Sequence, residues 1–94
     1  MTLRLTPRFS KRFAKLDPPV QDRVESALAS FIEDPTRKSL RRKKLKGHKD
    51  LWEISADMNY RVLLRREADA SVWYVVDVGK HDLVTQHRRR RGYR

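Results

Sequence analysis

The side chains best suited to chemistry fall in the C-terminal half of the chain, where strand alternation gathers them on one face. Residues 51–56 and 60–66 alternate apolar and polar side chains around the turn 57–59, which predicts a hairpin of two strands. The charged residues expected on its open face, or in the turn after the next strand, are Glu53, Arg61, Arg65, Lys80, His81 and Asp82. His87 follows six residues after His81.

Such a set of side chains is suited to cutting RNA at its own 2′-hydroxyl. That reaction needs a base to take the hydroxyl proton, an acid to protonate the leaving 5′-oxygen, and cations to stabilise the phosphorane between them. Imidazole, carboxylate and guanidinium groups supply all three. The pattern therefore predicts a phosphodiester-cleaving site on this face.

His81 is the best candidate acid or base, because the ordinary pKa of imidazole, about 6.5, lies near working pH. Arg61 is the best candidate for binding the phosphate, because its guanidinium presents a fixed fork of donors. The structural alternatives are a plain surface histidine for His81 and a cross-strand ion pair with Glu53 for Arg61. Glu53 is a candidate base or an exposed, solvated strand carboxylate, and His87 is a candidate acid or a tail histidine.

The sequence predicts neither a metal site nor a cofactor. Its three histidines, His48, His81 and His87, form no i, i+4 pair and no His-x-His motif. There is no glycine-rich phosphate loop, and the absence of cysteine excludes disulfides, thiolate zinc sites and thiol catalysis.

A basic stretch between residues 36 and 49 is a candidate RNA-backbone surface, with a solvated loop as the alternative. Hydrophobic periodicity is lost there, so a loop or a short helix end is expected. The cations proposed to contact RNA are Arg41, Arg42, Lys43, Lys44, Lys46, Lys49, Arg65 and Lys80. The arginine-rich tail 88–94 is a second candidate for binding phosphate. The alternative is a tail that stays disordered until a partner binds.

The elements that must position these residues can be read from the hydrophobic pattern. A short strand at 2–6 precedes a helix that Thr6 caps, with Phe9, Phe13 and Leu16 on its apolar side. The basic residues of this helix, expected to point to water, are Arg8, Lys11, Arg12 and Lys15. A second helix runs to Asp34, with a stripe at Val20, Val24, Ala27, Leu28, Phe31 and Ile32.

After the predicted hairpin, residues 72–78 form a third apolar strand that ends at Gly79, and residues 80–94 have little to bury. The order β-α-α-β-β-β predicts an α+β domain, with a helical hairpin packed on one face of a small antiparallel sheet. A single domain is expected over residues 1–87, with a basic tail at 88–94.

Charge is the strongest signal in the composition of the chain. The 94 residues carry 23 Lys and Arg against 12 Asp and Glu, a net charge of +11. This predicts nucleic acid or an acidic protein as the partner. No apolar run is long enough to span a bilayer and no signal peptide begins the chain, so a soluble, cytoplasmic protein is expected.

Three segments resemble a known family: "KLKGHKDLWEI", "NYRVLL" and "VVDVGKHD" stand in the order and spacing of RelE/ParE superfamily toxins. The likeness extends from the first strand to Asp82. It implies the fold predicted above and, in the RelE branch, an endoribonuclease that cleaves mRNA in the ribosomal A site. It also implies a cognate antitoxin that covers the active face, and the charge of +11 suits an acidic one.

The resemblance also implies roles for particular residues. Arg61 matches the phosphate-stabilising arginine of the family. His81 matches a position that holds arginine in RelE and a histidine acid or base in other relatives. His87 falls where RelE has a tyrosine, and Glu53 and Ser55 about where RelE has two lysines. The lysines available to replace that missing charge are Lys44, Lys46 and Lys49.

Three functions follow as hypotheses. In a ribosome-dependent mRNA interferase, Glu53 or His81 deprotonates the 2′-hydroxyl, Arg61 and Lys46 hold the phosphate, and His81 or His87 protonates the leaving oxygen. The second hypothesis is a ParE-like inhibitor of DNA gyrase without a nuclease site. The third is an RNA-binding domain without catalysis.

Overall fold

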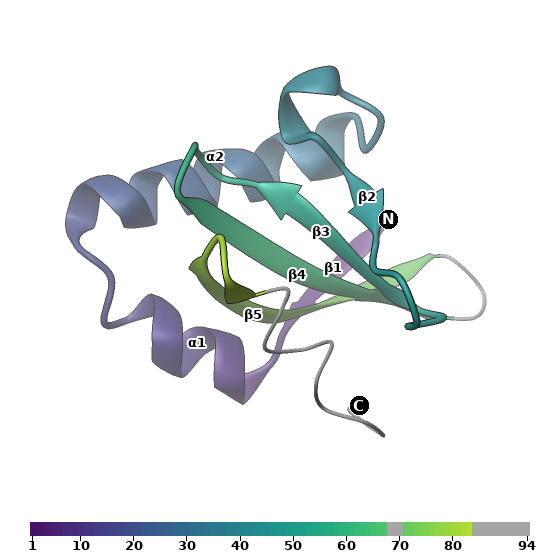
Figure 1. Cartoon of the computed structure of the whole chain (residues 1–94), viewed down its shortest axis with the longest axis horizontal. Coiled ribbons are helices and arrows are strands. Elements are labelled where there is room, and N and C mark those ends of the chain that lie inside the picture. The colour runs from purple at the N-terminus through teal and green to yellow at the C-terminus, as the bar shows by residue number, and fades with distance from the viewer. Residues whose placement is uncertain (68–70, 84–94) are drawn as a thin grey trace.

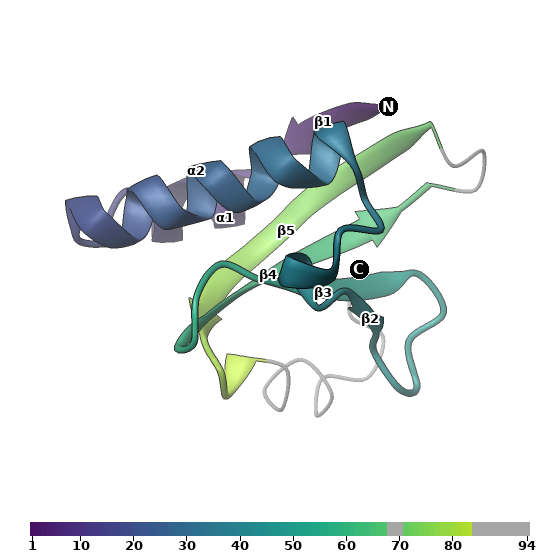
Figure 2. The same ribbon diagram turned by 90° about the horizontal axis from the view of Figure 1, so that it is seen from above.

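Two helices cover one face of a five-stranded sheet in the computed structural model, which describes residues 1–67 and 71–83 (Figure 1 and Figure 2). The elements in chain order are β1 (Thr2–Leu5), α1 (Pro7–Phe13), α2 (Pro18–Glu33), the 3-10 helix η1 (Lys38–Leu40), β2 (Lys43–Lys44), β3 (Leu51–Ser55), β4 (Tyr60–Arg66) and β5 (Val72–Lys80). The predicted α+β class is confirmed.

The strand order is β1-β5-β4-β3-β2, and one pairing differs from expectation. β2, β3, β4 and β5 pair antiparallel, but β1 runs parallel to β5, with Thr2 opposite Val72 and Leu5 opposite Val75. The helical pair between β1 and the later strands acts as a long crossover connection, and parallel neighbours require such a connection. Alternation within a strand cannot reveal its direction.

Both predicted helices are present, and Thr6 fixes the start of the first. Its hydroxyl accepts a hydrogen bond from the Phe9 amide at 3.2 Å and donates one to the Val75 carbonyl at 2.8 Å. In α2, Val24, Ala27 and Phe31 are buried. The Phe31 ring meets Trp73 of β5 edge to face, with 5.1 Å between the ring centroids. No helix in the described ranges has the length and apolar character needed to span a membrane.

The basic segment after α2 contains more structure than predicted, namely η1 and the short strand β2. Its two apolar residues explain why: Leu40 packs into the core beneath the helices, and Leu45 packs into a second cluster on the opposite face of the sheet. Lys43 then pairs with Glu53 and Lys44 with Trp52 along β3. The two buried leucines therefore fix this segment along the β3 edge of the sheet, although its composition is that of a loop.

The second cluster also bears on the expectation that residues 80–94 have little to bury, because one of them, Leu83, belongs to its core. Leu83 is 2% exposed, and it packs with Leu45, Leu51, Leu63 and Val76. A Cβ atom on Gly79 would lie 3.3 Å from Cδ1 of Leu83, so glycine permits this close approach. The face of the sheet away from the helices is thus partly covered.

Candidate active site and RNA-binding surface

Arg61 lies on the face of the sheet away from the helices, at the turn end of the β3–β4 hairpin. It stands opposite Ser55 in β3 and Gly79 in β5. Its Nη1 donates to the backbone carbonyls of Asp57, Tyr60 and Met58, at 2.7, 3.1 and 3.3 Å. These bonds hold the guanidinium in place beside the hairpin turn.

The turn itself is held by the side chain of Asp57. Oδ1 accepts hydrogen bonds from the amides of Asn59 and Tyr60, each at 2.8 Å, and Oδ2 lies 3.1 Å from Nη1 of Arg23 in α2. Partial burial acts to raise the pKa of Asp57, but the two amides and the Arg23 guanidinium together hold that pKa below its ordinary value. The Asp57 carboxylate is therefore the structural support of the Arg61 site.

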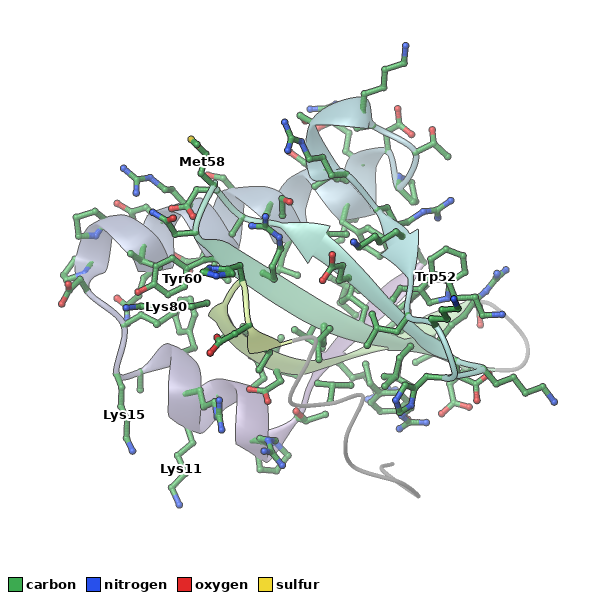
Figure 3. All side chains as sticks on the ribbon, viewed as in Figure 1. Lys11, Lys15, Trp52, Met58, Tyr60 and Lys80 are labelled. Carbon is green, nitrogen blue, oxygen red and sulfur yellow. The ribbon has the colours of Figure 1, made fainter. Side chains whose placement is uncertain are left out.

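His81 is exposed in the turn that follows β5, two residues beyond Gly79, which faces Arg61. The packing of Leu83 against Gly79 anchors the chain just after this turn. Arg61 and His81 thus lie at the same end of the sheet. Lys80 was expected beside them. It stands opposite Tyr60 and, two residues from buried Val78 in the same strand, shares the helix side of the sheet with it (Figure 3).

Glu53 differs from its predicted environment, because it is only 5% exposed. Oε1 lies 3.4 Å from Nζ of Lys43 in β2, and the buried Oε2 has no hydrogen-bond partner in the described part of the chain. The alternative pairing with Arg61 is not formed, because Glu53 stands opposite Leu63 and it is Ser55 that faces Arg61. The short strand β2, which the sequence did not predict, covers this carboxylate.

The basic residues of the 36–49 segment are exposed but lie on both sides of the β3 edge. Lys43 is on the Glu53 side, whereas the Arg42 guanidinium lies over the Trp52 ring, 5.0 Å from its centroid, at the edge of the helix-side core. The loop around Gly47 forms an open hollow of about 460 Å³ that Lys44, Lys46, His48 and Lys49 line. The Arg65 guanidinium lies 4.6 Å from the centroid of the Tyr74 ring on the open face.

The sequence pattern assigned no role to Asp77, an acidic residue of β5 that stands opposite Leu63 in β4. Its side chain is fully buried in β5, and Arg8 and Arg12 reach it from α1 at 3.1 and 3.4 Å. Both arginines were expected to point to water, as Lys11 and Lys15 do (Figure 3). The signal available in the sequence was a lone acid inside an apolar strand, together with two arginines spaced i, i+4 on a helix.

Two predicted features lie outside the described residues: His87 and the arginine tail 88–94. Within residues 1–67 and 71–83, no three His, Asp or Glu side chains come together as a metal site would require.

Solved structures with the same fold are numerous, although no protein-family model and no curated protein sequence matches the chain. A chain of the intact E. coli RelBE toxin-antitoxin complex is 26% identical, with a TM-score of 0.66, and the match covers 84% of this chain and 94% of that one. A variant of the E. coli toxin RelE in the free state is 25% identical, with a TM-score of 0.69 and 90% of each chain covered. A chain of the archaeal RelE-RelB complex from Pyrococcus horikoshii is 17% identical, with a TM-score of 0.69, over 84% of this chain and 92% of that one.

The two-helix layer on a sheet with a parallel β1–β5 edge is the fold that the chain shares with these small α+β toxins. These solved structures support a toxin of the RelE/ParE superfamily, as the three sequence segments implied.

Proposed function

We propose that this toxin is a ribosome-dependent endoribonuclease that cuts mRNA at the end of the sheet where Arg61 and His81 lie. The observation that carries the proposal is the placement of a fixed guanidinium and an exposed imidazole at that one end. RNA cleavage needs a cation that binds the phosphate and a group that transfers a proton. A protein that only binds gyrase needs no proton-transfer group.

In the proposed reaction, the 2′-hydroxyl oxygen attacks the adjacent phosphorus and the bond from phosphorus to the 5′-oxygen breaks. The products are a 2′,3′-cyclic phosphate and a free 5′-hydroxyl. Arg61 stabilises the charge on the phosphorane. Lys46 was the second cation expected there, but it lies beyond the Leu45–Leu51 pair at the other end of β3, so its proposed role is limited to contact with the RNA backbone further along the sheet. His81 carries out one of the two proton transfers, and the groups proposed for the other are Glu53 and His87.

We also propose a cognate antitoxin as the partner. Several of the similar structures are toxin-antitoxin complexes, and the charge of +11 suits an acidic segment lying over the active face. An apolar groove between β1, α1 and α2 offers a second contact, because Leu5 and Ile32 on its rim are 57% and 51% exposed. An amphipathic helix of the antitoxin is the partner proposed for this groove.

Primer extension on mRNA in a cell-free translation system tests the nuclease. The wild-type protein is expected to cut only when ribosomes translate the message. Arg61→Ala and His81→Ala are each expected to lower the cleavage rate by about 100-fold or more. Equal cutting by all three proteins would contradict the proposal. Inhibition of gyrase supercoiling without any cut in RNA would instead favour the ParE-like alternative.

A further inference from the structure

A small hollow lies beside Arg61, where the β3–β4 turn meets the end of η1. Its volume is about 270 Å³. The polar side chains that line it are two guanidinium groups, two hydroxyl groups and one carboxylate: Arg41, Arg61, Ser39, Ser55 and Asp57. Two of these residues, Ser39 and Arg41, come from the basic segment, so the hollow joins the two parts of the chain to which the sequence assigned RNA contacts.

The donors in this hollow are available to a ligand. Arg61 uses only Nη1 to bind the turn carbonyls, so its Nε and Nη2 have no partner in the part of the chain that the structure describes. The hydroxyls of Ser39 and Ser55 likewise have no hydrogen-bond partner among residues 1–67 and 71–83. A fork of N–H groups flanked by hydroxyls is the arrangement that binds a phosphate group.

The one acid in the hollow does not oppose an anion. Both oxygens of the Asp57 carboxylate are occupied, Oδ1 by two backbone amides and Oδ2 by Arg23. Its charge is therefore compensated locally, and the hollow presents a net positive charge from Arg41 and Arg61.

The backbone of Arg41 has a strained conformation at the end of η1, beside the hollow. Arg41 has φ 48° and ψ 44°, the left-handed conformation, which is unfavourable for a residue other than glycine. Its amide closes η1 by donating to the Lys38 carbonyl at 3.1 Å, and buried Leu40 anchors the turn from the other side. The chain thus turns sharply here, with the Arg41 side chain on the wall of the hollow.

We propose that this hollow is a phosphate subsite that binds the phosphodiester next to the scissile one, with Arg61 shared between the two. The ligand is the sugar-phosphate backbone of single-stranded RNA, recognised by the two guanidinium groups and the two hydroxyls without contact to a base. This inference deepens the proposed nuclease function and rests on it. Arg41 is a binding residue in this assignment and takes no part in proton transfer.

The test compares Arg41→Asn with Arg37→Asn. Asparagine tolerates the left-handed backbone at position 41, so the fold is kept while the charge is removed. Arg37 is the matched control because it lies in the same segment, does not line the hollow, and is held by Glu33 at 2.8 Å. The probe is a fluorescent single-stranded oligoribonucleotide with 2′-O-methyl groups, which binds but cannot be cut.

Arg41→Asn is expected to bind this probe about tenfold more weakly and to lower the slope of log affinity against log salt by about 0.7, the share of one phosphate on a single strand. Arg37→Asn is expected to match the wild-type protein. In the translation assay, Arg41→Asn should raise KM and keep kcat, whereas Arg61→Ala should lower kcat. Equal affinity and salt slope for the two asparagine variants would overturn the subsite even if the wild-type protein cuts mRNA. A wild-type protein that cuts no mRNA, yet shows the Arg41-specific loss of binding, would overturn the nuclease proposal and leave the phosphate site standing.

Discussion

Asp77 in β5 and Arg8 in α1 form an ion pair of 3.1 Å between positions 69 residues apart in the sequence. Because Arg12 also reaches the carboxylate and the Val78 amide donates to it at 2.8 Å, this buried acid has several partners. The pair joins the first helix to the strand that leads to His81. Helix packing and site geometry are therefore linked through one side chain.

Replacing Asp77 with alanine is expected to lower the free energy of unfolding by about 2 kcal/mol, because the change removes the ion pairs and the bond to the Val78 amide together. Urea unfolding followed by circular dichroism measures the loss. The matched control is Glu67→Ala, which removes a more exposed pair with Arg65 at 3.6 Å and should cost about 0.5 kcal/mol or less. Equal losses in the two variants would contradict the structural role of Asp77.

Asp57 should make the stability of the fold depend on pH on the acid side. Its pKa is lower in the folded chain, so the ionised form stabilises the fold above the unfolded pKa of about 3.9. That contribution is lost as the pH falls through the lower, folded pKa. Asp57→Asn should therefore be less stable than the wild-type protein at neutral pH, with the difference disappearing in acid.

Thermal unfolding measured from neutral pH down into the acid range checks the role of Asp57. Asp50→Asn is the control, because the exposed Asp50 side chain makes no hydrogen bond in the described part of the chain. This variant should follow the wild-type curve. A difference between Asp57→Asn and wild type that persists unchanged in acid would show that the charge of Asp57 is not responsible.

Gly79 and Leu83 should behave as a coupled pair. Gly79→Ala places a methyl group 3.3 Å from Leu83 Cδ1 and is expected to cost about 1 to 2 kcal/mol of stability. Leu83→Ala empties part of the second cluster and should cost about 2 to 4 kcal/mol. Because the double variant removes the clash, its loss should be smaller than the sum of the two single losses in urea unfolding. Simple additivity would refute the contact.

Glu53→Gln tests Glu53 apart from the other two proposed proton-transfer groups, His81 and His87. Both oxygens of Glu53 lie in a buried side chain under Lys43, and a general base must come within hydrogen-bond reach of the proton it takes. We therefore expect Glu53→Gln to retain cleavage within about fivefold, whereas His81→Ala loses about 100-fold. Loss of about 100-fold in Glu53→Gln, with unchanged thermal stability, would make Glu53 the base.

The apolar groove predicts how the antitoxin contact can be weakened. Leu5→Glu introduces a charge at the rim of the groove and is expected to reduce antitoxin affinity by about tenfold or more, since a buried charge without a partner opposes docking. Ala14→Glu adds the same charge to an exposed position of the chain outside the groove and should bind normally. Titration with the purified antitoxin measures both affinities. An undiminished affinity in Leu5→Glu would exclude the groove as the contact.

The sequence alone determined the elements and the side chains that share a face. Period-two alternation placed Arg61 and Glu53 on the same side of the hairpin, and period 3.6 placed Val24, Ala27 and Phe31 on the buried side of α2. Thr6 was recognisable as a helix cap from its side chain and the proline after it. These features depend on neighbours a few residues away, which is why local patterns reveal them.

Only the tertiary structure decided which distant segments meet. The parallel pairing of β1 with β5, the β2 strand that covers Glu53 and the return of Leu83 onto Gly79 each join parts of the chain that no local period relates. For the same reason Asp77 is a buried partner of two arginines. Arg61 likewise binds the carbonyls of the hairpin turn and forms no pair with Glu53. Burial and ion pairing depend on long-range packing, so the environment of each charge was set by the assembled fold.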